Sequence, residues 1–193
     1  MAIELLNPEA SQAIGSPLNL PVGRWTIVVG VEDNMESAEW QVGRLTEELA
    51  AATGLEIRRD SGAEPLWSAL TAFPTLPIGE ITISANLRSS DVAGYVAELT
   101  PGRWSIACHA ANGIVRAHAL APEAEAIAPE IDRLRALAVR HGGNLTLLRC
   151  PTTLKTRLKV WGEPRPDWSI CERIKSALDP SGVMNPGRFI GTI

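Results

Sequence analysis

The sequence lacks the features that would place the protein in a membrane or on nucleic acid. No apolar run approaches the roughly 18 residues that a membrane-crossing helix needs. The start, MAIELLNPEAS, has no basic stretch followed by an apolar one, so it does not resemble a secretory signal. A net charge of only −4 gives nucleic acid or a charged surface no particular attraction. We therefore expect a cytoplasmic protein with no membrane span and no nucleic-acid partner.

Common catalytic and metal-binding motifs are also missing. There is no Walker-type or GxGxxG loop, no HExxH and no GxSxG. Cys108, Cys150 and Cys171 fit no zinc or redox spacing, so we interpret them as small core residues and predict no metal site. The six tryptophans are spread along the whole chain, and we expect each to pack its own element into one core.

What the sequence does have is enough apolar material for one compact fold. Apolar residues make up 45% of the 193 positions, which is close to the average for globular proteins. No low-complexity tract, long charge run or internal linker divides the chain. We therefore predict a single domain over residues 1–193.

Hydrophobic periodicity predicts strands and helices that alternate along the chain. The predicted strands are 23–31, 55–59, 79–87, 103–109, 114–120 and 144–149. The predicted helices are 33–53, 64–73, 89–99, 122–141 and 167–178. Asn112-Gly113 is a strong signal for a tight turn between two of the strands. This order favours an α+β fold, with a ferredoxin-like antiparallel or mixed sheet, helices packed on one face and an irregular C-terminal tail.

The most distinctive segment is the tail CERIKSALDPSGVMNPGRF, residues 171–189. Asp179-Pro180 ends a helix in a turn, and Asn185-Pro186-Gly187 makes a second turn shortly afterwards. Two turns around Val183-Met184 predict a rigid, sharply folded segment that holds Asn185 in a fixed direction. From turn chemistry alone, the segment is either a latch onto its own domain or part of a site.

The run LDPSGVMNPGRF resembles the C-terminal signature of FAD-linked oxidases of the vanillyl-alcohol-oxidase type. In that family a helix leads into an Asp-Pro turn, an apolar pair, Asn-Pro-Gly and a basic residue. Residues 1–13, 66–73 and 103–117 resemble successive pieces of the same C-terminal (cap) domain more loosely. The resemblance thus spans nearly the whole chain, and it is closest to the small FAD-binding subunit of glycolate oxidase.

This resemblance implies a part of an FAD-dependent oxidoreductase that acts on a small 2-hydroxy acid such as glycolate or D-lactate. Carried over from the family, Asn185 would contact FAD, Gly187 would let the backbone approach it closely, and Arg188 stands at the basic position. No segment resembles the family's pyrophosphate-holding loops. The resemblance therefore implies that the N-terminal flavin-binding domain is absent, and that a missing domain or partner subunit mainly holds the flavin. Whether Met1 is the natural start is left open.

A second piece of the resemblance is CHAANGIVRAH, residues 108–118. His109 matches the first histidine of a family hairpin in which two histidines bind a divalent metal, but Arg116 stands at the second position and cannot bind one. The family's Glu-His pair has no counterpart near His141. From the residues alone, Arg116 and His118 share one face of a strand, where they would hold a carboxylate or face solvent. His109, Arg116 and His118 are our candidates for the substrate side.

A basic segment follows, with Lys155, Arg157, Lys159 and Arg165 interleaved with tryptophans. The alternation at 155, 157 and 159 predicts one face of an extended segment, which would meet an anion, a partner domain or only solvent. The alternative to an oxidase is a non-enzymatic ferredoxin-like module that binds a protein partner or a small ligand. The sequence does not determine the substrate, the catalytic residues or the oligomeric state.

Overall fold

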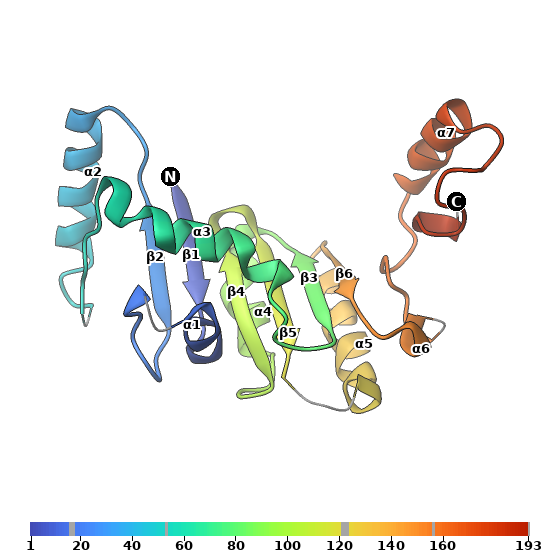
Figure 1. Cartoon of the computed structure of the whole chain (residues 1–193), viewed down its shortest axis with the longest axis horizontal. Helices are drawn as coiled ribbons and strands as arrows, with labels where there is room; N and C mark the ends of the chain where they lie inside the picture. Colours follow the sequence, from blue (N-terminus) through green and yellow to red (C-terminus); the bar gives the residue numbers. More distant parts are fainter. Residues whose placement is uncertain (16–17, 53, 121–123, 156, 193) are drawn as a thin grey trace.

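The computed structural model describes residues 1–15, 18–52, 54–120, 124–155 and 157–192 of the chain. These residues form an α+β fold around one six-stranded sheet, in which the strands lie in the order β2-β1-β4-β5-β3-β6 (Figure 1). The strands are β1 (Ala2–Leu6), β2 (Thr26–Gly30), β3 (Thr82–Asn86), β4 (Trp104–His109), β5 (Ile114–Ala119) and β6 (Asn144–Arg149). Every neighbouring pair is antiparallel.

Seven α-helices lie among the described residues. They are α1 (Pro8–Ile14), α2 (Met35–Glu48), α3 (Glu64–Ala72), α4 (Val92–Ala97), α5 (Ala124–Arg140), α6 (Thr152–Lys155) and α7 (Trp168–Leu178). Not one of them is long and apolar enough to cross a membrane.

Four strands and two helices follow the ferredoxin-like order. The chain runs β3-α4-β4-β5-α5-β6, and the four strands lie side by side as β4-β5-β3-β6. β1 and β2 extend this sheet beyond the edge of β4. The predicted α+β, ferredoxin-like sheet is confirmed, and it is antiparallel rather than mixed.

The main core lies between this sheet and the two helices α4 and α5, which cover one face (Figure 1). Every second side chain of β3, β5 and β6 is buried against them, because side chains alternate between the two faces of a strand. The predicted apolar stripe of α5 is buried in full, and it consists of Ile127, Ile131, Leu134, Leu137 and Ala138. The predicted helix start at Pro122 lies outside the described residues.

A smaller core covers part of the opposite face of the sheet, under α1 and α3. Leu6 of β1 and Ala107 of β4 pack there against Leu66, Leu70 and Phe73. α3 runs across this face in front of β2, β1 and β4 in Figure 1. Helices on one face of the sheet, as we predicted, are therefore found in the ferredoxin-like part. The helices α1 and α3 add a further layer on the opposite face.

Two extended segments were predicted wrongly. Residues 55–59 form no strand, because no neighbouring strand pairs with them, and Arg58 instead donates a hydrogen bond to the carbonyl of Leu18 at 2.6 Å. The basic segment is not extended either. Its first part is the helix α6, and the N–H of Leu158 donates to the carbonyl of Leu154 at 2.9 Å, which brings these two buried leucines together.

The tryptophans do not all share one core. Trp104 is fully buried, as predicted, but the side chain of Trp40 on α2 is 68% exposed and that of Trp25 is 48% exposed. α2 itself has no buried residue. The stripe of half-buried side chains on α2 therefore packs only loosely on the rest of the chain.

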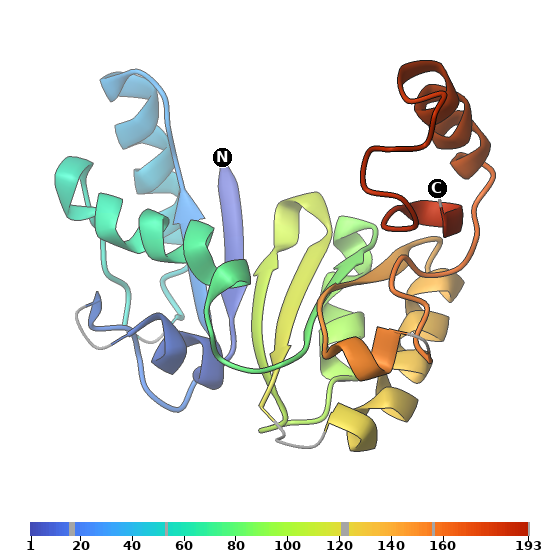
Figure 2. The ribbon, with the colours of Figure 1, turned by 45° about the vertical axis from the view of Figure 1, so that its right-hand side comes forward.

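The last segment, residues 160–192, leaves the sheet, and we call it the C-terminal arm. Figures 1 and 2 show α7 standing apart from the sheet, beyond β6 and α5. The arm is tied to β6 where it begins. Leu147 N–H donates to the carbonyl of Val160 at 2.8 Å, and the Asn144 amide donates to the carbonyl of Trp161 at 3.3 Å. Apart from α7 and a final short 3₁₀ turn, the arm is irregular, as predicted.

Candidate functional site

The turns of the C-terminal arm are held by the buried side chain of Asp179. It accepts hydrogen bonds from the N–H groups of Val183 at 3.0 Å and Met184 at 2.9 Å. It also pairs with Lys175, one helical turn earlier, whose ammonium donates to the carbonyl of Met184 at 2.6 Å. The hydrogen bond from Lys175, followed by these backbone donors, holds the pKa of Asp179 below its usual value. The Asp-Pro turn is thus fixed by charge as well as by backbone geometry.

The three residues that we predicted to contact FAD lie on the exposed turn that follows. Asn185 has a φ of +48° and Gly187 a φ of +70°, in the left-handed region that asparagine and glycine tolerate best. Arg188 N–H donates to the carbonyl of Asn185 at 3.2 Å and closes the turn. The two consecutive turns are present as predicted. Their contact with a flavin stays a prediction.

Two of these three residues, Asn185 and Arg188, line an open hollow of about 440 Å³. Its lining consists of Trp161, Lys175, Met184, Asn185, Arg188 and Phe189. The rings of Trp161 and Phe189 meet edge to face, with centroids 5.3 Å apart. Aromatic surface, a side-chain amide and the cation of Arg188 in one place suit a flat, anionic, heteroaromatic ligand, whereas the charge of Lys175 is already neutralised by Asp179. The chemistry of this lining is therefore compatible with part of a flavin nucleotide.

The arm also exposes apolar surface. Ile170, Ile174 and Leu178 follow each other on successive turns of α7, and each is more than half exposed. Val183 and Met184 on the adjoining turn are exposed as well. A contiguous apolar stripe on a solvent-facing helix is typical of an interaction surface.

A second polar group lies on the sheet face opposite α4 and α5. Glu4 of β1 stands directly across from His109 of β4, and its Oε1 is hydrogen-bonded to Nδ1 of the imidazole. The side chain of Glu4 is only 12% exposed and that of His109 is 33% exposed. Burial raises the pKa of Glu4 above its usual value, while His109 and the charge of Arg116 act in the opposite direction.

Arg116 lies on the same face of the sheet, beside this pair. It is opposite Ala107, whose side chain points to the same face as that of His109, two residues further along β4. The Nε of Arg116 is buried and has no hydrogen-bond partner among the described residues. A buried donor without an acceptor costs free energy, so this atom is an unfavourable feature of the sheet face.

His118 has a structural role in this fold. It is fully buried, with Nε2 2.8 Å from the carbonyl of Phe73 and Nδ1 3.0 Å from the hydroxyl of Thr82. Since the carbonyl can only accept, Nε2 donates to it, and Nδ1 accepts from Thr82. Desolvation lowers the pKa of this histidine. His118 shares a strand face with Arg116 as predicted, but neither of its nitrogens is left for a substrate.

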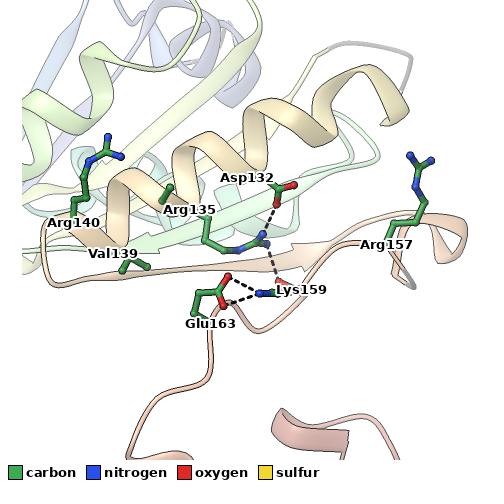
Figure 3. Close-up of a pocket in the computed structure, with 8 residues that line it drawn as sticks. Asp132, Arg135, Val139, Arg140, Arg157, Lys159 and Glu163 are labelled. Atoms are coloured by element: carbon green, nitrogen blue, oxygen red, sulfur yellow. Dashed lines mark hydrogen bonds and ion pairs between the residues drawn. The ribbon is translucent and has the colours of Figure 1, made fainter.

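The predicted basic segment contributes to a different hollow, of about 500 Å³, beside α5 (Figure 3). Arg135 donates to Asp132 at 2.7 Å and to the carbonyl of Lys159 at 2.8 Å, and Lys159 pairs with Glu163 at 2.7 Å. Figure 3 shows Arg157 pointing away from these pairs. Because carboxylates already neutralise Arg135 and Lys159, this hollow is a poorer anion site than the basic sequence indicates.

Glu4 was not among the residues predicted from the sequence, although one signal pointed to it. A single charged residue inside the apolar run AIELL is unusual for a strand whose neighbours are partly buried. Its partner, however, is 105 positions away. Among the described residues, no three His, Cys, Asp or Glu side chains gather closely enough to hold a metal ion.

The arm and the Glu4–His109 pair belong to the same end of the sheet. Residues that stand opposite one another on neighbouring strands form a row that begins at Asn144, which holds the arm. From strand to strand, the row continues through Asn86, Ile114, His109 and Glu4. Three strand spacings separate the backbones of Asn144 and His109, which is about 14 Å. Side chains directly opposite each other share a face, so this row is continuous on one side of the sheet.

Comparison with known proteins singles out the C-terminal arm. No curated protein matches the chain. A family model does match, that of the C-terminal domain of FAD-linked oxidases, over residues 160–189. These residues make up nearly all of the arm, from the strand tether to Phe189, and include the whole lining of its hollow. The match thus supports the relationship that the tail motif predicts, to the C-terminal domain of FAD-linked oxidases.

Proposed function

We propose that the chain is the cap domain of an FAD-dependent oxidoreductase, and that a separate flavin-binding domain or subunit holds most of the cofactor. One observation carries this proposal. The residues that match the FAD-linked oxidase family are the ones that fold into the arm and gather around its hollow. The alternative function, a non-enzymatic module built on the same sheet, explains neither the family match nor the residues that line the hollow.

In this proposal the turn of the arm faces the flavin. Asn185 offers a side-chain amide to the polar edge of the flavin ring, and Arg188 supplies a positive charge next to it. Apart from Gly187 and its two neighbours in sequence, no atom of the described residues lies within 4 Å of the place where a Cβ on Gly187 would stand, so the backbone is open to close approach. When bound, the flavin supplies the redox chemistry, and the chain contributes position, charge and exclusion of water.

The proposal includes a partner protein, because the apolar stripe of α7 is exposed to solvent and would be stabilised by burial against another protein surface. Ile170, Ile174 and Leu178 would be buried against the flavin-binding half, which would place the adjoining Asn185 turn over the cofactor. Burying side chains of this size contributes about 1.5–3 kcal/mol each. The chain alone would then bind FAD poorly.

The proposed substrate is a small 2-hydroxy acid such as glycolate or D-lactate. The resemblance to the glycolate oxidase type suggests it, and the sheet face offers chemistry that suits it. Arg116 places a positive charge on this face, and His109 lies two residues along β4 from the register partner of Arg116. A guanidinium binds carboxylates, as it binds phosphates, through charge-assisted hydrogen bonds.

The flavin spectrum tests this function. The chain is mixed with the flavin-binding subunit of an FAD-linked oxidase encoded beside it, and the FAD absorption bands are recorded with and without the chain. We expect the chain to shift these bands, and Asn185→Ala to abolish most of the shift while the complex still forms.

The matched control is Asn19→Ala, because Asn19 is also an exposed asparagine with a positive φ (+51°) but lies outside the arm. It should leave the spectrum as in the wild type. A complex whose flavin bands do not respond to the chain at all would overturn the cap function.

A further inference from the structure

The C-terminal arm leaves the fold at a point where three consecutive backbone carbonyls, those of residues 159–161, are all held. The donors are the Arg135 side chain to Lys159, the Leu147 N–H to Val160 and the Asn144 side chain to Trp161, at 2.8, 2.8 and 3.3 Å. We call these three contacts, together with the adjoining Gly162, the arm clamp. Its donors come from α5 and β6, both of which pack in the main core. The base of the arm is therefore attached to the best-packed part of the molecule.

Arg135 is directed at the arm by its own helix. Its side chain is buried in the wall of the hollow beside α5 (Figure 3). Nη1 donates to Asp132, one turn earlier on α5, while Nη2 donates to the carbonyl of Lys159. A guanidinium is planar and presents its donors in fixed directions, so the carboxylate sets the direction of the donor that reaches the arm. The carboxylate also offsets the cost of burying the charge.

Gly162 brings the arm against β6 more closely than any other residue could. Its φ is +87°, where a side chain is strained. A Cβ at this position would stand 2.1 Å from Oδ1 of Asn144, the same buried side chain whose amide holds Trp161. It would also stand 2.9 Å from the carbonyl oxygen of Leu145. The direction in which the chain leaves the sheet is thus set by contact with the sheet itself.

A stiff segment, residues 163–167, connects the clamp to α7. Its sequence is EPRPD, and each proline has a fixed φ and restricts the residue before it to extended backbone. At its end, Trp168 N–H donates to the carbonyl of Arg165 at 3.0 Å, and the Ser169 hydroxyl donates to the carbonyl of Pro166 at 2.9 Å. The direction set at the clamp is therefore passed on to α7 with little freedom.

The far end of the arm returns to the clamp. Phe189 meets the ring of Trp161 there, and both rings line the hollow of the Asn185 turn. On the other side, Asn144 begins the row of opposed residues that crosses the sheet to Glu4. The clamp thus lies between the two surfaces that the proposed function brings to the cofactor, the turn of the arm and the face of the sheet.

We propose that Arg135, Asn144 and Gly162 are positioning residues, which hold the C-terminal arm and the sheet as one rigid unit. When α7 docks on the flavin-binding half, the clamp then places the sheet over the flavin. This inference rests on the proposed function, and it adds the residues that couple docking of the arm to coverage of the flavin. Each of them acts through the backbone of the arm, so none is a catalytic residue.

Residual dipolar couplings of the ¹⁵N-labelled chain test the rigidity. In the wild type, we expect the amides of α7 and α5 to fit one alignment tensor. Gly162→Ala should require two tensors, because the added Cβ forces the chain away from Asn144. The matched control is Gly54→Ala, because Gly54 has a similar φ of +81° but lies outside the arm. Apart from its neighbours in sequence, no described atom lies within 4 Å of a Cβ placed there. Two tensors in the wild type would overturn the proposal.

The same couplings test Arg135. Arg135→Met removes the donor to Lys159 and keeps an unbranched side chain, so the couplings of α7 should become smaller than those of α5. Arg135→Lys should restore part of the difference, since an ammonium can still donate to the carbonyl. The control is Arg140→Met, because Arg140 lies at the end of the same helix and lines the same hollow but is exposed. Wild-type couplings in Arg135→Met would remove this residue from the clamp.

The positioning role is measured in the complex, by a readout that does not depend on the arm's own contact with the flavin. The flavin-binding half is mixed with the chain, and iodide quenching of the flavin fluorescence is recorded. The wild-type chain should shield the flavin, because a cap excludes solvent from it. With Gly162→Ala the flavin bands should still respond, since Asn185 arrives with the arm, but iodide should quench the flavin as strongly as without the chain. Gly54→Ala should shield it as the wild type does.

The positioning role and the cap function can fail separately. If the wild type and Gly162→Ala shield the flavin equally, the clamp positions nothing and the cap function stands. If the flavin bands do not respond to the wild-type chain, the cap function is wrong. The positioning role then fails with it, and a single alignment tensor would show only that the arm is firmly attached to the sheet.

Discussion

Trp161 and Phe189 close the C-terminal arm through an edge-to-face contact of their rings, at an interplanar angle of 76°. The carbonyl of Trp161 is at the same time bonded to Asn144 on the sheet. One residue thus joins the arm to the fold and closes the arm on itself. The family match ends at Phe189, the other half of this contact.

Trp161→Ala should open the arm without unfolding the sheet. The ring contact is worth about 0.5–1.5 kcal/mol beyond the area it buries, and the main core under α4 and α5 does not involve it. We expect faster amide exchange at residues 183–189 and almost no change in Tm. Trp40→Ala is the matched control, because Trp40 is an exposed tryptophan on α2. Unchanged exchange in Trp161→Ala would show that the turn is held by Asp179 alone.

Asp179 should make the turn of the arm sensitive to acid. Its pKa is held below the ordinary value of 3.8, so the folded turn is stabilised by the ionised form. That stabilisation is fully present above the ordinary value and is lost as the pH falls through the lowered pKa. The amide shifts of Val183 and Met184, followed from pH 6 to pH 2, should therefore change below pH 4.

Asp179→Asn tests this cause, because the amide keeps one acceptor but has no charge to lose. In this variant the two amide shifts should no longer depend on pH in that range, and the turn should already be loosened at pH 6. Asp167→Asn, an exposed aspartate in a surface ion pair with Arg165, is the control. A wild-type titration curve in Asp179→Asn would rule out this carboxylate as the cause.

The arm could be predicted from the sequence because its structure is local. Asp179-Pro180 and Asn185-Pro186-Gly187 specify turns through their own backbone preferences, whatever the rest of the chain does. The helix α5 could be predicted for the same reason, since its stripe of apolar residues repeats over several turns. Both belong to segments whose conformation is decided within a few residues.

Other elements depend on partners far along the chain. β1 is a short strand that includes a charged residue, and it is a strand because β4 and β2 lie on either side of it. Residues 55–59 show a clearer alternation but have no neighbouring strand, and they form none. Glu4 was missed for the same reason, because only the sheet register brings it to His109. A local sequence pattern does not indicate which distant strand a segment will pair with.

His118 should make the whole fold less stable as the solution becomes more acidic. Desolvation lowers its pKa from the ordinary 6.5, so below that value the unfolded chain takes up a proton that the folded chain does not. The free energy of unfolding should therefore fall as the pH drops from 7.5 through 6.5, with a slope of at most about 1.4 kcal/mol per pH unit.

Urea unfolding of the wild type and of His118→Gln at pH 7.5, 6.5 and 5.5 measures this slope. Glutamine can still donate to the carbonyl of Phe73, but it has no proton to gain, so the variant should show a flatter dependence. The control is His141→Gln, which removes a partly exposed histidine that lies beside Asp91 and is not part of the buried core. If the free energy of unfolding depends on pH equally in the wild type and in His118→Gln, protonation of the buried imidazole is not the cause of the loss of stability in acid.

Asn7 should be the most costly single polar residue to remove. Its side chain is buried and makes three hydrogen bonds, which join the start of α1 to β4. Oδ1 accepts from Ala10 N–H at 2.9 Å and from Ile106 N–H at 2.8 Å, and Nδ2 donates to the carbonyl of Trp104 at 2.7 Å. Without this side chain, two buried N–H groups and a carbonyl lose a partner at once.

We expect Asn7→Ala to lower the free energy of unfolding in urea by about 3 kcal/mol, since each buried group left unsatisfied costs about 1–3 kcal/mol and water can reach some of them. The matched variant is Asn34→Ala, which removes an exposed N-cap from α2 that accepts one hydrogen bond, from Ser37. Loss of such a cap costs about 1 kcal/mol. Equal losses in the two variants would mean that Asn7 is only a helix cap, and that the attachment of β1 and α1 to β4 depends on apolar packing around Leu6.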